Sequence, residues 1–160
     1  MPKAFSEQEK EIIAGRLLEQ GYKQFSAYGL RKTNIEEIAR AAGISKGAFY
    51  LFYESKEALF MDVVEEIEER VRRELIEAVD LPGPSARARL YLVFKKAVEL
   101  FSSLPILQYI TGGDFELLFR RVPAKKLQDH LSSDQDFFND LIARCEKSGI
   151  PIKVEADQVL

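Results

Sequence analysis

The sequence contains few of the residues that cross-link or interrupt a small fold. Its 160 residues include one cysteine, one histidine and no tryptophan, with only 9 glycines and 6 prolines. The single Cys145 cannot form an intrachain disulfide, and Met1–Ser6 lacks the apolar stretch of a secretory signal. We therefore expect a cytoplasmic protein.

The sequence also lacks a long apolar run and an excess of positive charge. Its longest uncharged run, Leu100–Gly113, is too short to cross a bilayer, so no transmembrane helix is expected. The formal net charge is −3, although residues 1–56 carry nine basic and seven acidic side chains, a local charge of +2. This mild asymmetry neither excludes nucleic acid as a partner nor predicts it.

Apolar periodicity and helix-capping residues predict an all-α chain. A capping box at Ser6–Glu9 opens a helix over 6–28, which Gly29 ends in a left-handed conformation. A second capping box at Thr33–Glu36 opens a short helix that Gly43 closes, and Ser45 caps a third. Ser55 then caps a long helix whose apolar stripe reaches Val79. Further helices are expected over 85–103, 105–112, 114–121, 123–131 and 135–148.

This order of elements predicts two domains. Residues 1–54 form an N-terminal three-helix head with a helix-turn-helix at about 34–53, and the long helix joins it to a helical body over 55–160. The last residues, 155–160, have the pattern of a helix that is beginning, so we expect the body to be incomplete at its C-terminus.

The segment 33–50 has the residue types that a DNA-reading helix-turn-helix needs. Gly43 supplies the backbone angle of the turn, Ile44 fills the gap between the helices, and Ala39 allows them to cross closely. The N-terminus of the second helix presents Lys46 to guanine or phosphate and Ala48 to a thymine methyl. Short second helices of this kind enter the major groove.

Other side chains at the helix ends are expected to contact phosphates. Thr33, Tyr50 and Lys56 would clamp the backbone on either side, whereas Arg31 and Lys32 would add general electrostatic attraction. The residues expected at DNA are therefore Arg31, Lys32, Thr33, Asn34, Ser45, Lys46, Gly47, Ala48, Phe49, Tyr50, Tyr53 and Lys56.

Roughly residues 10–60 resemble the TetR family of transcriptional regulators. The matching residues are Phe25, Gly29, Thr33, Ile38–Ala39, Ala42–Ser45, Gly47, Phe49–Tyr50 and Ser55–Leu59. The resemblance implies a homodimer that binds a palindromic DNA operator as a repressor and is released by a small-molecule effector bound in the body. The chain departs from the family's pattern at Leu51 and Phe52, where polar phosphate contacts are usual, and Asn34 replaces a frequent threonine.

The body is rich in aromatic residues, which could pack as core or line a mostly apolar effector cavity. The candidates for effector contact are Phe94, Phe101, Tyr109, Phe115, Phe119 and Phe138. His130 has no second His or Cys at ligand spacing, so neither a metal site nor any other cofactor is expected, and Cys145 is expected to be a small buried side chain.

Two other classes of protein compete with a regulator. An enzyme would need an acid–base pair, an activated nucleophile, a phosphate loop or a metal set, and none has a recognisable spacing here, so we expect no enzyme. A helical protein-interaction module without operator specificity remains the alternative. The two remaining functions differ in whether a specific DNA duplex is bound.

Overall fold

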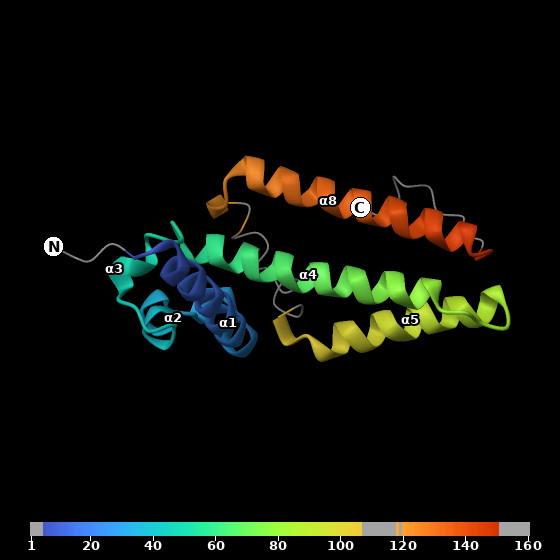
Figure 1. Ribbon diagram of the computed structural model, residues 1–160, viewed down its shortest axis with the longest axis horizontal. Helices are drawn as coiled ribbons and strands as arrows, with labels where there is room; N and C mark the ends of the chain where they lie inside the picture. The colour runs from blue at the N-terminus through green and yellow to red at the C-terminus, as the bar shows by residue number, and fades with distance from the viewer. Residues whose placement is uncertain (1–4, 107–117, 119, 151–160) are drawn as a thin grey trace. The chain divides into compact units, whose positions relative to one another are not determined.

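The computed structural model describes residues 5–106, 118 and 120–150, and every regular element within those residues is a helix. The helices are α1 (Glu7–Lys32), α2 (Ile35–Ala41), α3 (Lys46–Phe49), α4 (Lys56–Asp80), α5 (Ala86–Ser103) and α8 (Ala124–Lys147), as Figure 1 shows. The predicted all-α class is confirmed. The helices expected over 105–112 and 114–121 fall mostly outside the described residues, as does the segment 155–160.

Four serines begin helices through the same local hydrogen bond. In each case the hydroxyl oxygen accepts from the backbone N–H three residues later; the pairs are Ser6–Glu9, Ser45–Ala48, Ser55–Ala58 and Ser85–Ala88. The Glu9 carboxylate accepts in turn from the Ser6 N–H at 2.8 Å, which completes the predicted capping box. These hydrogen bonds hold the pKa of Glu9 below its usual value.

Glycines lie where the sequence predicts that the first two helices end, although α1 continues past Gly29 to Lys32. Gly29 has φ 72° and ψ 171°, a region that only glycine adopts without strain, and it interrupts α1 before a last short turn. Gly43 has φ 81°, and the N–H groups of Gly43 and Ile44 donate to the carbonyls of Arg40 and Ala39. This Schellman arrangement satisfies the free carbonyls at the end of α2 and reverses the chain toward α3.

One predicted pair of helices is a single helix. Separate helices were predicted over 123–131 and 135–148, but α8 runs without interruption through Ser132, Ser133 and Asp134. The Ser133 hydroxyl and the Asp134 carboxylate both accept hydrogen bonds from Arg72 of α4. Because these polar side chains bond to another helix, they do not compete for the backbone of α8.

The chain divides into two compact units, Met1–Glu66 with Leu104–Val122 and Ile67–Ser103 with Pro123–Leu160. The division between the units falls within α4, between Glu66 and Ile67. The predicted domain boundary between residues 54 and 55 concerns function rather than compactness, and it stays a prediction. None of the helices in the described residues combines the length and low charge that crossing a membrane requires.

The first unit packs α1, α2, α3 and the start of α4 around buried apolar side chains. Phe25 of α1 meets Phe60 of α4 edge to face, with ring centroids 4.9 Å apart. Gly21 allows α1 and α4 to approach closely, because a Cβ placed there would lie 3.1 Å from Leu59 Cδ2 and 3.3 Å from Val63 Cγ2. The head therefore depends on the beginning of the long helix for its core.

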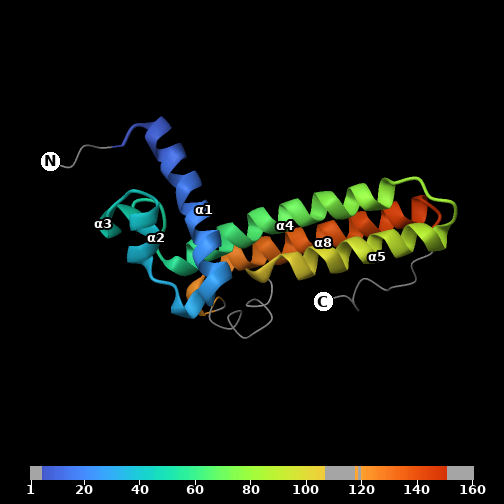
Figure 2. The same cartoon turned by 90° about the horizontal axis from the view of Figure 1, so that it is seen from below.

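In the second unit, α5 and α8 run alongside the remaining part of α4, as Figures 1 and 2 both show. The buried centre at the far end of α8 consists of Val79, Cys145 and Ile150, against which Ala86, Leu90, Val93 and Leu141 pack. Burial raises the pKa of the Cys145 thiol. The expectation that Cys145 is a small buried side chain is confirmed.

We expect Gly21→Val to lower the free energy of unfolding by about 1 to 3 kcal/mol, because the added methyl groups would overpack the contact with Leu59 and Val63. Gly15→Val is the matched control, since a Cβ there has no neighbour within 4 Å on the same helix. Urea unfolding monitored by circular dichroism measures both. Equal effects of the two substitutions would contradict the close packing of α1 on α4.

Candidate nucleic-acid interface

The N-terminus of α3 is the exposed part of the helix-turn-helix. Ser45, Lys46 and Gly47 are exposed and Ala48 is half-buried, so the positive end of the helix and the Lys46 ammonium face solvent together. Gly47 adds no side chain, and a Cβ there would meet only the Ser45 hydroxyl at 3.8 Å. Tyr50 and Leu51 continue this surface, with 51% and 74% of their areas exposed.

Phe49 was predicted to contact DNA, and this prediction is wrong for the folded head. Its side chain is completely buried, with ring centroids 5.6 Å from Tyr50 and 5.9 Å from Tyr53. Phe49 is therefore the anchor that fixes α3 to the core of the head. The exposed residues on either side of it keep the role of candidate DNA contacts.

Thr33 is also turned inward, where a phosphate cannot reach its hydroxyl. The side chain is buried, and Oγ1 donates to the Gly29 carbonyl at 2.7 Å. The predicted capping box at this point is wrong, because the exposed Asn34 caps α2 by accepting from the Glu36 N–H at 2.9 Å. Thr33 thus shapes the turn between α1 and α2, while Asn34 remains on the surface.

Lys56 has a structural position that the sequence did not indicate. Its Nζ donates to the carbonyl oxygens of Leu30, Arg31 and Thr33 at 2.7, 3.1 and 3.0 Å. An ammonium group has three hydrogens, so these three bonds use its whole donor capacity. The contact of Lys56 with a phosphate stays a prediction, and it would require at least one of these three hydrogen bonds to be exchanged.

Tyr53 is half-buried, and its hydroxyl is hydrogen-bonded to the Asp62 carboxylate of α4. Burial, followed by the negative charges of Asp62 and Glu66, raises the pKa of the phenol well above its usual value. The Tyr53 hydroxyl is therefore protonated and donates to Asp62 of α4. To contact DNA, as predicted, the hydroxyl would have to give up this hydrogen bond.

The remaining predicted DNA contacts lie on the surface. Arg31 and Lys32 are exposed at the end of α1. Sequence reasoning missed Arg121, which lines the same open hollow of about 490 Å³ as Arg31, Tyr50 and Lys56. No local motif could have found it, because it lies far along the chain. The carboxylates of Glu54 and Glu57 also line this hollow, so it is not a purely basic surface.

The candidate effector residues that the structure describes are on exposed surfaces. Phe94 and Phe101 of α5 are 63% and 52% exposed, and Phe138 of α8 is 37% exposed. On α5, the exposed Tyr91, Phe94, Val98 and Phe101 recur at helical spacing and form one apolar face. Tyr109, Phe115 and Phe119 lie outside the described residues.

The segment that builds this head matches a known family. Residues 17–63 fit the model described as bacterial regulatory proteins, tetR family. Over these residues the chain is similar to the TetR family. Its recognised part covers α2, α3 and the flanking portions of α1 and α4, so the exposed α3 N-terminus belongs to the matched segment.

Individual relatives extend this result. The uncharacterised helix-turn-helix transcriptional regulator YdgC of Bacillus subtilis (strain 168) is 36% identical over 58 residues, which are 36% of this chain and 30% of YdgC. The matched segment thus spans less than a third of that relative.

Two solved structures have the same fold at low identity. The fatty acid degradation regulator FadR from Bacillus halodurans has a TM-score of 0.66 at 15% identity, covering 98% of this chain and 77% of its own. The transcriptional regulator FadR from Bacillus subtilis, solved in complex with stearoyl-CoA, has a TM-score of 0.60 at 18% identity, with 90% and 77% covered.

We expect Lys56→Ala to destabilise the head by about 1 to 3 kcal/mol, because it leaves three backbone carbonyls without their charged donor. Lys32→Ala, at an exposed position near the same end of α1, should change stability by no more than about 0.5 kcal/mol. Urea unfolding of both variants gives the comparison. A Lys56→Ala protein as stable as the wild type would show that the ammonium does not hold the turn.

Proposed function

We propose that this protein is a sequence-specific DNA-binding transcriptional regulator, a repressor that leaves its operator when a small, mostly apolar effector binds its body. The observation that carries the proposal is the α3 N-terminus, where Ser45, Lys46 and Gly47 are exposed on a helix-turn-helix matched by the TetR-family model. A regulator of this kind acts where the chromosome is, so we also propose a cytoplasmic location.

The geometry divides the predicted DNA contacts into two groups. Exposed residues can reach DNA directly, and these are Arg31, Lys32, Asn34, Ser45, Lys46, Gly47 and Tyr50, with Ala48 half-buried beside them. Thr33, Phe49, Tyr53 and Lys56 act from inside the head, through the position that they give to α2 and α3. Base reading is therefore assigned to Lys46 and Ala48 and phosphate attraction to the exposed cations.

The functional unit that we propose is a two-fold dimer on a palindromic operator. One short recognition helix covers only a few base pairs, so two copies are needed for useful specificity. The recognition helices of such a dimer lie about 34 to 36 Å apart, or a modest distance beyond, in successive major grooves. Selection of bound duplexes from a random pool tests operator and symmetry together, because a dimer enriches a palindrome. Enrichment of no sequence would instead support the protein-interaction module.

The effector class rests on the apolar face of α5. Its exposed aromatic and branched side chains favour a ligand with a large apolar part, and the related fold was solved with stearoyl-CoA, which carries a long acyl chain. Phe94, Phe101 and Phe138 remain the candidate contacts among the described residues, together with the predicted Tyr109, Phe115 and Phe119. Binding there would lower DNA affinity only if the ligand prefers the conformation that does not fit the operator.

We expect Lys46→Ala to weaken operator binding by about 1 to 3 kcal/mol, because it removes an exposed contact to a base or a phosphate. If the lost contact is to phosphate, the slope of log K against log salt should become shallower by about 0.9. Lys56→Ala is the comparison: its slope should equal that of the wild type under conditions where the variant is folded. Fluorescence anisotropy from 50 to 300 mM salt, on the order of the range where phosphate contacts respond, measures both. If only Lys56→Ala makes the slope shallower, Lys56 and not Lys46 contacts a phosphate.

The effector mechanism makes a reciprocal prediction. A long-chain acyl ligand that binds the body should lower operator affinity on the order of 5- to 150-fold, and operator DNA should weaken ligand binding by the same factor. Titrations of the ligand with and without the selected duplex give both quantities. If acyl ligands bind and leave operator affinity unchanged, the α5 face is not a regulatory site.

A further inference from the structure

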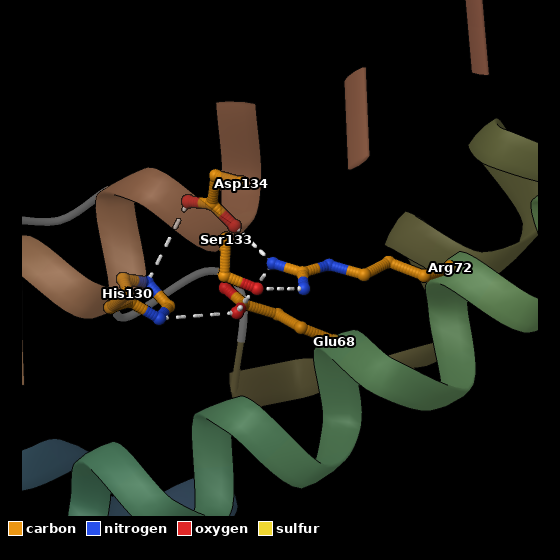
Figure 3. A network of polar contacts seen from close by, with 5 residues as sticks. All are labelled: Glu68, Arg72, His130, Ser133 and Asp134. Carbon is orange, nitrogen blue, oxygen red and sulfur yellow. Dashed lines mark hydrogen bonds and ion pairs between the residues drawn. The ribbon is translucent and has the colours of Figure 1, made fainter. Parts of the chain in front are cut away.

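His130 lies between two carboxylates in the second unit. It is 7% exposed on α8; its Nδ1 faces Glu68 of α4 at 3.6 Å, and its Nε2 faces Asp134 at 3.7 Å. Figure 3 shows one ring nitrogen directed toward each carboxylate. Both distances are longer than a normal hydrogen bond, so the imidazole faces two carboxylate oxygens without a hydrogen bond to either.

The donor atoms of the three side chains lie near one another. His130 and Asp134 are four residues apart on α8 and therefore share one face of that helix, while Glu68 comes from the neighbouring α4. One ligand atom from each residue lies within 4.8 Å of the other two. Donor atoms on a tetrahedral Zn²⁺ are about 3.3 to 3.6 Å apart, given bonds of about 2.0 to 2.2 Å. To reach that geometry the donor atoms must move closer together, and the His130 ring must turn or a carboxylate must shift so that both carboxylates meet the same ring nitrogen.

Arg72 supplies positive charge to the same carboxylates. Its Nη2 pairs with Asp134 Oδ1 and lies 3.8 Å from Glu68 Oε2, while Nη1 donates to the Ser133 hydroxyl at 2.7 Å. The guanidinium also lies over the Phe137 ring, 5.4 Å from its centroid. A metal dication would compete with Arg72 for Asp134 and Glu68, and the ring and the Ser133 hydroxyl would still hold the guanidinium nearby.

We propose that Glu68, His130 and Asp134 form a binding site for Zn²⁺, in which Arg72 takes the place of the metal when none is bound. One imidazole nitrogen and two carboxylate oxygens are a ligand set that suits Zn²⁺, and a nitrogen ligand disfavours Mg²⁺ and Ca²⁺. The site is independent of the DNA contacts, since it ties α8 to α4 within the second unit. It also departs from the sequence expectation of no metal at His130, because Glu68 is too distant along the chain for a spacing motif to find.

The test uses Zn²⁺ alone and the full chain without an affinity tag. We expect isothermal titration calorimetry to detect one Zn²⁺ per chain, with at least roughly tenfold weaker binding for His130→Ala. Arg72→Gln should bind Zn²⁺ more tightly than the wild type, because the competing cation is gone. Asp140→Asn is the matched control, since Asp140 forms an exposed ion pair with Arg144 on the same helix and should leave the affinity unchanged.

The single histidine makes the location testable in the wild-type protein. Because the chain has one imidazole, a Zn²⁺-dependent shift of its ¹⁵N resonances can come only from His130. This measurement remains decisive even if a variant fails to fold. Unmoved imidazole resonances at saturating Zn²⁺, or equal affinity of wild type and His130→Ala, would overturn the site. Weaker binding by Arg72→Gln would overturn the exchange between guanidinium and metal.

Discussion

The N-terminal head depends on one cation–backbone interaction, in which the half-buried Lys56 ammonium donates to carbonyls in the last turn of α1 and just beyond it. These carbonyls belong to Leu30 and Arg31, in the last turn of α1 after the interruption at Gly29, and to Thr33, which follows the helix. Without Lys56 they would lose a charged donor at the point where α1, α2 and α4 meet. The direction in which α2 leaves this point sets where α3 lies, so the exposed recognition surface is a consequence of this contact.

The cations of this acidic chain differ in what surrounds them. Lys56 and Arg72 are turned toward carbonyls and carboxylates of their own unit, whereas Lys46, Arg31 and Lys32 face solvent. A charge count over the sequence treats all five alike. The side chains of the second group are the ones that a phosphate could contact directly.

In the second unit, polar contacts between helices help to keep α8 a single continuous helix. Arg72 binds Ser133 and Asp134, so the residues that resemble a helix break keep α8 continuous. The continuous α8 in turn places His130 beside Glu68 while Asp134 lies one turn further on. A polar cluster that holds two helices together thereby also gathers the donor atoms of a metal site.

The sequence alone determined the features that depend on bonds between near neighbours. The serine caps, the glycine-ended helices and the turn at Gly43 involve partners three to five residues apart, so their residue types and spacing are sufficient to predict them. The family pattern in residues 17–63 is made of the same local signals.

Only the tertiary structure decided which side chains point inward. Lys56 reaches carbonyls 23 to 26 residues away, and Arg72 reaches Asp134 over 62 residues. Phe49 and Thr33 have residue types that suit either DNA or core, and their burial follows from helices that pack against them from elsewhere in the chain. A spacing pattern carries no information about such partners, because the distance between them is set by how the helices pack and not by how many residues separate them.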